Sequence, residues 1–202
     1  MRIFLAIAAV ALAAVAWATE PAEAQAPEAP DAYVTFLGEQ VIDKLGVDEP
    51  RPQRAERFKS MMERHLALDA IARFVTGRYW ERGSPEDRTR FRAAFKELLA
   101  NRFLPAFEGQ SDVDLAVRDS RKVGERLWVV KVRVHQPGGD PTSIALRLLE
   151  GDAGLKVVDI VTQGISLGLT LREEYTTYLK NHDGDMNALI SQIEARSREL
   201  AS

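Results

Sequence analysis

The sequence predicts an α+β fold in which a four-stranded antiparallel meander sheet packs against a helical subregion and encloses an apolar pocket. Apolar residues recur about every 3.6 residues before Gly109 and every second residue after it, which indicates helices followed by strands. Short turns join the expected strands and leave no room for crossover helices, as an antiparallel meander requires. Two amphipathic segments follow the strands, and we expect them to be helices.

The first residues of the chain have the pattern of a secretory signal peptide. Arg2 precedes an apolar run over residues 3–17, which is too short to cross a bilayer of about 30 Å as a helix. Small residues then form A-x-A cleavage sites, and we favour cleavage after Ala24 or Ala26 over an uncleaved anchor. The expected organisation is a signal peptide over 1–24, a flexible Pro/Ala tether over 25–32 and a single domain over 33–200.

Composition narrows the function classes. The chain contains no cysteine, which excludes disulfide bridges, a thiol nucleophile and a thiolate metal site. Loss of Arg2, Glu20 and Glu23 with the signal peptide removes one positive and two negative charges, so the formal net charge changes from −3 to −2. A nucleic-acid binder would carry an excess of basic residues, which this slightly acidic chain lacks. A signal peptide on a chain that needs no disulfide bridges fits a bacterial periplasm, with full secretion as the alternative.

Helical spacing marks the first half of the domain. A stripe of Val34, Leu37, Val41 and Leu45 predicts a helix that ends near Gly46. After Pro50 and Pro52, a second helix is expected through residues 58–65, and a short third helix should end at Gly77. The next helix has the clearest start, with Ser84 followed by Pro85 and two acidic residues, and Pro105 should end it. Its apolar stripe consists of Phe91, Phe95, Leu98, Leu99, Phe103 and Phe107.

Period-two alternation marks the expected strands. Their apolar positions are Val113, Leu115 and Val117, then Trp128, Val130, Val132 and Val134, then Ile144, Leu146 and Leu148, and finally the run over 155–161. The closing helices are expected at about residues 169–179 and 186–200, and Asp185 should cap the second.

One short motif suggests catalysis. Gly164-Ile165-Ser166-Leu167-Gly168 matches the G-x-S-x-G nucleophile elbow of serine hydrolases. That motif needs a mostly parallel sheet and a histidine base, whereas this serine follows an antiparallel meander and only His182 lies downstream. We therefore interpret Ser166 as part of a strand-to-helix corner, and a small secreted serine esterase using Ser166 remains the less favoured alternative. The three histidines have no metal-ligand spacing, and no metal or cofactor is expected.

Two blocks of the sequence resemble a known family. The first, HLALDAIARFVTGRYWERGSPEDRTRFRAAFKELLANRF, is similar to the central helical block of the MlaC-type proteins, also called the toluene-tolerance or ABC transporter auxiliary component family. The second contains Val158-Asp159-Ile160, the Gly164 corner and Leu189-Ile190, in the order that these proteins have. The resemblance covers about residues 33–200. Leu155 replaces a tryptophan that is usual near the start of the last strand, and a hopanoid-associated branch of the family is an alternative.

The resemblance implies a periplasmic carrier that holds the acyl chains of a glycerophospholipid between a curved sheet and helices. Its implied partners are an inner-membrane ABC transporter with a lipid-binding ring protein and an outer-membrane lipoprotein–porin complex. It implies no catalytic residue, and a structural adaptor with an apolar protein-binding face is a further alternative. By face and position, the expected pocket residues are Phe74, Trp80, Phe91, Phe95, Leu98, Val130, Val132, Ile144, Leu146 and Ile160.

Overall fold

The computed structural model describes residues 26–45, 49–107, 113–136 and 138–201, so the expected signal peptide over 1–24 lies outside the described residues. The first part of the described chain is helical, with α1 (Pro30–Leu45), α2 (Arg51–His65), α3 (Leu68–Thr76), the 3₁₀ helix η1 (Gly77–Arg82), α4 (Pro85–Phe103) and the 3₁₀ helix η2 (Leu104–Phe107). The second part contains β1 (Asp114–Lys122), β2 (Leu127–His135), β3 (Thr142–Gly151), β4 (Gly154–Thr162), β5 (Ile165–Ser166), α5 (Leu167–Asn181) and α6 (Met186–Ala201).

Two helix boundaries follow directly from proline. α1 begins at Pro30, before the expected start of the domain at residue 33, because a proline at the first helical position already has a helical φ and Asp31 adds negative charge to the first turn. α4 ends at Phe103, and the chain continues as η2, because Pro105 has no N–H to donate to a carbonyl of the preceding turn.

The predicted start of α4 is confirmed. Ser84 Oγ accepts a hydrogen bond from Asp87 N at 3.0 Å, and Asp87 Oδ2 accepts one from Ser84 N at 3.0 Å. These two bonds form a capping box, which satisfies backbone N–H groups that the first turn leaves free. Gly77 ends α3 as expected, with φ of 56°, and a Cβ there would lie 3.2 Å from the Arg172 guanidinium.

The antiparallel meander is confirmed, and it contains five strands in the order β1-β2-β3-β4-β5 where four were expected. The additional strand arises because Gln163 and Gly164, with φ of 53° and 80°, reverse the chain and pair Ile165 with Thr162. A strand of two residues is too short to produce an alternating pattern in the sequence.

The buried apolar residues form two large cores. The helical core consists of the buried apolar residues of α3, η1, α4, α5 and α6, together with Met62 of α2. The sheet core consists of Tyr33, Val34, Val130, Val132, Leu148, Leu155 and Val157. A small third cluster of Leu45, Met61 and Leu104 joins α1, α2 and η2.

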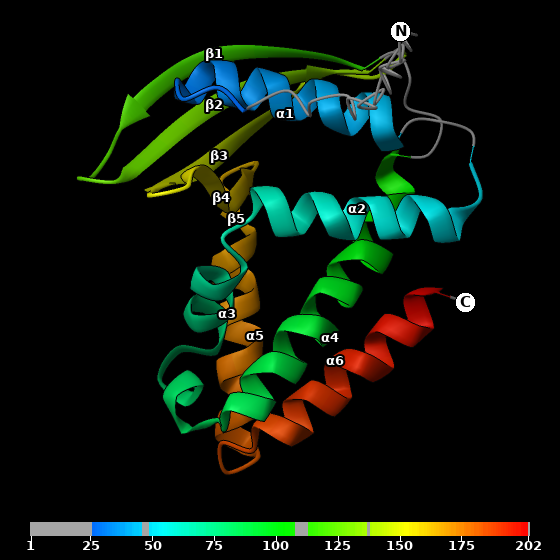
Figure 1. Ribbon diagram of the computed structural model, residues 1–202, viewed down its shortest axis with the longest axis vertical. Helices are drawn as coiled ribbons and strands as arrows, with labels where there is room; N and C mark the ends of the chain where they lie inside the picture. The colour runs from blue at the N-terminus through cyan, green and yellow to red at the C-terminus, as the bar shows by residue number, and fades with distance from the viewer. Residues whose placement is uncertain (1–25, 46–48, 108–112, 137, 202) are drawn as a thin grey trace, which may run out of the picture.

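The two cores occupy different parts of the molecule (Figure 1). The sheet curves over α1, which lies along β1 and β2, and the helices α3 to α6 form a separate body beyond the β4 edge. α2 crosses between them. The fold thus places a boundary between the sheet and the helical body.

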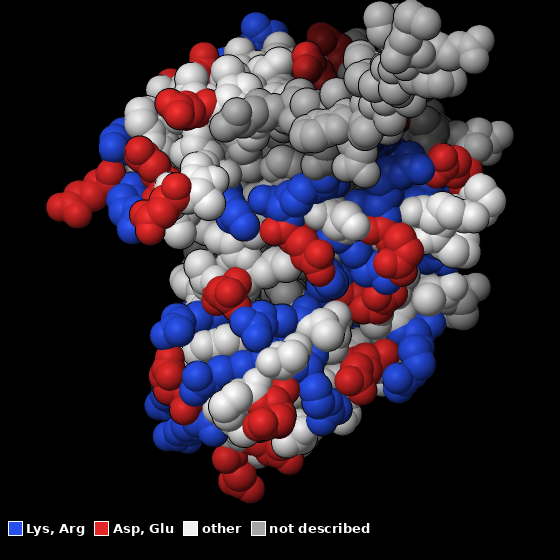
Figure 2. All heavy atoms as spheres, viewed as in Figure 1, with Lys and Arg blue, Asp and Glu red and all other residues white. Residues whose placement is uncertain are grey.

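The surface of the helical body carries interleaved charges of both signs, and it has a recess below α2 (Figure 2). Among the described residues, no helix combines the length and the apolar character that crossing a bilayer requires.

Candidate functional site

Leu66 lies where the two cores meet. It follows α2 and packs, partly buried, against both the helical core and the sheet core. Its backbone runs beside β4, with a parallel bridge between Leu66 and Val157, and Ala67 N donates a hydrogen bond to Val157 O at 3.0 Å. We call this contact between the Leu66–Ala67 connection and β4 the seam. It joins the helical body to the edge of the sheet.

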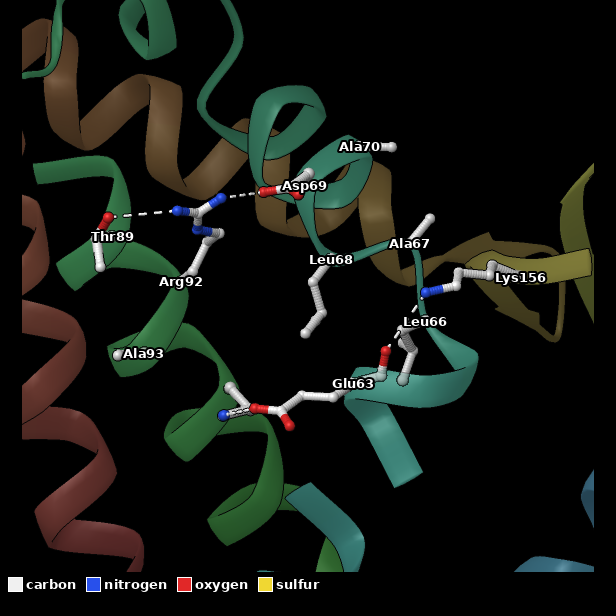
Figure 3. Close-up of a pocket in the computed structure, with 11 residues that line it drawn as sticks. Glu63, Leu66, Ala67, Leu68, Asp69, Ala70, Thr89, Arg92, Ala93 and Lys156 are labelled. Atoms are coloured by element: carbon white, nitrogen blue, oxygen red, sulfur yellow. Dashed lines mark hydrogen bonds and ion pairs between the residues drawn. The ribbon is translucent and has the colours of Figure 1, made fainter. Parts of the chain in front are cut away.

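A pocket opens to the surface at the seam (Figure 3). Its volume is about 590 Å³, within the usual range for small-molecule sites. Its lining comes from the end of α2, the start of α3, one face of α4 and β4, and consists of Glu63, Leu66, Ala67, Leu68, Asp69, Ala70, Thr89, Arg92, Ala93, Lys96 and Lys156. Leu66 and Leu68 are the large apolar residues of this lining, and we call them the floor. We call the charged residues Glu63, Asp69, Arg92, Lys96 and Lys156 the rim. A ligand with one apolar part and one charged part matches a lining that contains both leucines and charged side chains.

Two ion pairs cross the rim from α4. Lys96 pairs with Glu63 of α2, and Arg92 pairs with Asp69 of α3. The Lys96 ammonium holds the pKa of Glu63 below its ordinary value. Both carboxylates are well exposed, and exposed pairs contribute at most about 1 kcal/mol to stability. The rim can therefore rearrange at a small energetic cost.

Lys156 approaches the pocket from the opposite side, on β4 (Figure 3). Its Nζ donates a hydrogen bond to the backbone oxygen of Glu63 at 3.4 Å. Within the described chain it makes no ion pair with a carboxylate. The pocket thus has a cation that pairs with no carboxylate of the described residues.

Four of the ten predicted pocket residues, Trp80, Phe91, Phe95 and Leu98, lie together in the helical core. Phe91 stacks on Phe95 with ring centroids 5.6 Å apart, and the Trp80 ring meets Phe91 edge-on at 6.0 Å. The structure therefore brings these residues together, and their rings fill the space between the helices.

The predicted residues of the sheet share one face, through the cross-strand pairs Val132–Ile144, Val130–Leu146 and Leu146–Ile160. The two valines are buried in the sheet core, whereas Ile160 is 36% exposed and Phe74 of α3 is 43% exposed. None of the ten predicted residues lines the pocket at the seam. Their role in holding a ligand stays a prediction.

Sequence reasoning missed the residues that line this pocket, because they come from three separate segments. One signal was present: Leu66 and Leu68 alternate in HLALD and interrupt the helical period between α2 and α3. This interruption marks the point at which the chain leaves α2 and pairs with β4.

Ser166 has a structural role at the start of α5. Its Oγ accepts a hydrogen bond from Leu169 N at 3.0 Å and donates one to Asp159 Oδ2 at 2.6 Å. The other Asp159 oxygen accepts from Gly168 N at 2.8 Å, and Arg147 Nη1 lies 3.1 Å from Oδ2. These bonds attach α5 to β3 and β4, so the corner inferred for the G-x-S-x-G motif is a helix cap.

His182, the candidate base of a serine esterase, lies at the opposite end of α5 from Ser166. His182 follows the last residue of α5, stacks on Tyr178 and hydrogen-bonds to Tyr178 O through Nδ1 at 2.9 Å. The length of α5, 15 residues or roughly 22 Å, separates His182 from Ser166. In the part of the chain that the structure describes, no three acidic or histidine side chains gather closely enough to hold a metal ion.

The fold and the sequence both resemble known proteins. A solved structure of the phospholipid-binding protein from Ralstonia solanacearum in complex with a phospholipid superimposes with a TM-score of 0.75, covering 85% of this chain and 98% of that chain at 20% identity. No functionally curated protein matches this sequence. The model of the MlaC protein family matches residues 37–195, most of the chain. The chain therefore belongs to the MlaC family.

Proposed function

We propose that this protein is a periplasmic carrier that binds the acyl chains of a glycerophospholipid. It moves the lipid between an inner-membrane ABC transporter with its lipid-binding ring protein and an outer-membrane lipoprotein–porin complex. The observation that carries this proposal is the match to the MlaC family over residues 37–195. The phospholipid in the similar Ralstonia solanacearum structure supports the same class of ligand.

The seam supports a specific position for the acyl chains. Leu66 lies on the floor of the pocket and contacts both cores, so a chain that enters beside it would pass between the helical core and the sheet core. Each buried methylene contributes about 0.8 kcal/mol, and shielding of ~20 methylenes gives roughly 16 kcal/mol of gross transfer energy. A lipid held in this way would leave through water very slowly. Release would therefore require docking to a partner.

The surroundings of Ser166 favour binding over catalysis. Its hydroxyl is used as a helix cap and as a donor to Asp159, and no histidine base is next to it among the described residues. The signal peptide pattern supports export to the periplasm. The chain has no cysteine, so its folding there depends on no disulfide.

Mass spectrometry of lipid extracted from the mature protein tests the proposal. The protein is purified from a bacterial periplasm, and we expect about one phospholipid molecule per chain. Stoichiometric hopanoid would assign the chain to the hopanoid-associated branch. Absence of lipid, together with labelling of Ser166 by a fluorophosphonate probe, would favour the esterase.

A bulky residue in the pocket tests the position of the lipid. Ala93 lines the pocket from α4 and is exposed, so Ala93→Trp fills the pocket without disturbing either core. We expect this variant to lose co-purified lipid and to keep its free energy of unfolding. Ser191→Trp is the matched control, because Ser191 is exposed on α6, away from the pocket. Normal lipid content in Ala93→Trp would show that the lipid enters elsewhere.

A further inference from the structure

The rim of the pocket carries more positive than negative charge. Its cations are Arg92, Lys96 and Lys156, and its carboxylates are Glu63 and Asp69. The two ion pairs use both carboxylates, which leaves Lys156 without a carboxylate partner in the described part of the chain. A half-buried cation in a pocket that is also lined by leucines suits a ligand with an anionic group next to an apolar one.

We propose that this rim binds the phosphate of a phospholipid headgroup and that Lys156 recognises it. The inference deepens the function proposed above and rests on it. The Lys156 ammonium has three N–H donors, and the one bond that it makes to the described residues, to the backbone oxygen of Glu63, is long at 3.4 Å. It therefore has donors available for a phosphate oxygen, with which lysine pairs as a point charge.

The opposite wall of the pocket supplies the remaining cations. Arg92 of α4 lies across the pocket from Lys156 of β4 (Figure 3). Lys96, one turn further along α4, also lines the pocket. Their carboxylate partners are exposed, with 76% of the Asp69 side chain and 55% of the Glu63 side chain accessible. When a phosphate enters, Arg92 and Lys96 can turn toward it while the two carboxylates become solvated, because exposed pairs are weak.

The apolar floor orients the ligand. Leu66 and Leu68 line the pocket together with the charged rim, and Leu66 packs against both cores. A lipid with its phosphate at the rim would direct its glycerol and acyl chains toward the seam. The ligand class is thus a phosphodiester attached to acyl chains, and a diacylglycerol with the same chains lacks the group that Lys156 binds.

Titration with two short-chain lipids tests the assignment. Lipid-free mature protein is titrated with diheptanoyl phosphatidylglycerol and with diheptanoyl glycerol, and binding is measured by calorimetry. Hydrogen bonds to charged groups are stronger than those between neutral groups, so we expect the wild type to bind the phospholipid about tenfold more tightly than the diacylglycerol. Lys156→Met should remove most of this preference, and Lys156→Arg should retain it. Lys180→Met, an equal loss of charge at an exposed position of α5, should leave the preference unchanged.

The outcomes separate this inference from the proposed function. Equal affinity of the wild type for both lipids, or a preference that survives in Lys156→Met, would overturn the phosphate site and leave lipid binding intact. Failure of the wild type to bind either lipid would overturn both. Inorganic phosphate that binds as tightly as the phospholipid, with the same dependence on Lys156, would replace the headgroup assignment by a site for free phosphate.

Discussion

The helical core and the sheet core differ in how they are enclosed. In the described chain the helical core contains nineteen buried residues, and helices on several sides contribute them. Its rings interlock, with Tyr175 meeting both Phe91 and Phe95 edge-on. The sheet core contains seven buried residues, and α1 contributes only Tyr33 and Val34 to it. The helical core is therefore closed by its own elements, whereas α1 is the only described helix that contributes buried residues to the sheet core.

This difference indicates which part of the molecule can change its packing to admit a ligand. Insertion of an acyl chain among interlocked rings would cost many close contacts, because protein interiors pack as densely as organic crystals. At the seam, Leu66 is only partly buried and the neighbouring ion pairs are exposed. We expect the helical body to stay fixed while the sheet and α1 move relative to it.

Truncation of Phe91 should have the largest effect on stability. Phe91 is fully buried and contacts the rings of Trp80, Phe95 and Tyr175, so Phe91→Ala should lower the free energy of unfolding by about 3–5 kcal/mol. Urea unfolding of lipid-free protein measures this loss. A loss under about 1 kcal/mol would mean that the helical core is not the rigid part of the molecule.

Alkaline pH should weaken the sheet core through Tyr33. Burial raises the pKa of Tyr33 from 10.0 to about 12, so the unfolded chain ionises at this residue before the folded chain does. The resulting stabilisation is complete below pH 10, and it is lost as the pH rises from 10 through 12. Urea unfolding across this window should show a smaller decline for Tyr33→Phe than for the wild type. Parallel declines would mean that Tyr33 is accessible to water.

Loss of the Ser166 hydroxyl should have a moderate effect on the attachment of α5 to the sheet. Ser166→Ala removes the helix cap and one donor to Asp159, and we expect the free energy of unfolding to fall by about 1 kcal/mol. Lipid content should remain normal. Loss of lipid-dependent function with unchanged stability would instead indicate that the hydroxyl acts in chemistry.

Removal of the Tyr175 hydroxyl should slightly stabilise the helical core. Tyr175 is buried, and its Oη has no hydrogen-bond partner among the described residues. Because an unsatisfied buried polar group is costly, Tyr175→Phe should raise the free energy of unfolding by about 1 kcal/mol. Thermal unfolding gives the Tm of the wild type and of Tyr175→Phe, and we expect the variant to have the higher value. A lower Tm for the variant would show that the hydroxyl has a hydrogen-bond partner in solution.

Much of the fold could be predicted from periodicity and capping residues. The change of period after Gly109 separated helices from strands, and Ser84, Gly77 and Asp185 marked helix ends that the structure confirms. Periodicity identifies the apolar face of an element but not the element that covers it. For this reason the stripe containing Phe91 and Phe95 was predictable, whereas its packing against α5 and α6, away from the sheet, was not.

The candidate site was harder to predict than the fold. Glu63, Lys96 and Lys156 are far apart in the sequence and are common residue types on solvated helix and strand faces. The pairing of the Leu66–Ala67 connection with Val157 brings the end of α2 to the β4 edge and completes the pocket. Such a long-range contact leaves no local pattern in the sequence.

Distances between spin labels, measured with and without bound lipid, test the central claim that lipid lodges between the two cores. The chain has no cysteine, so labels can be attached to cysteines introduced at exposed positions. One pair, Thr35→Cys on α1 with Ser191→Cys on α6, spans the seam, and a second pair, Thr177→Cys on α5 with Ser191→Cys, lies within the helical body. We predict that lipid changes the distance across the seam and leaves the distance within the helical body unchanged. A constant distance across the seam, with lipid shown to be bound, would contradict this account.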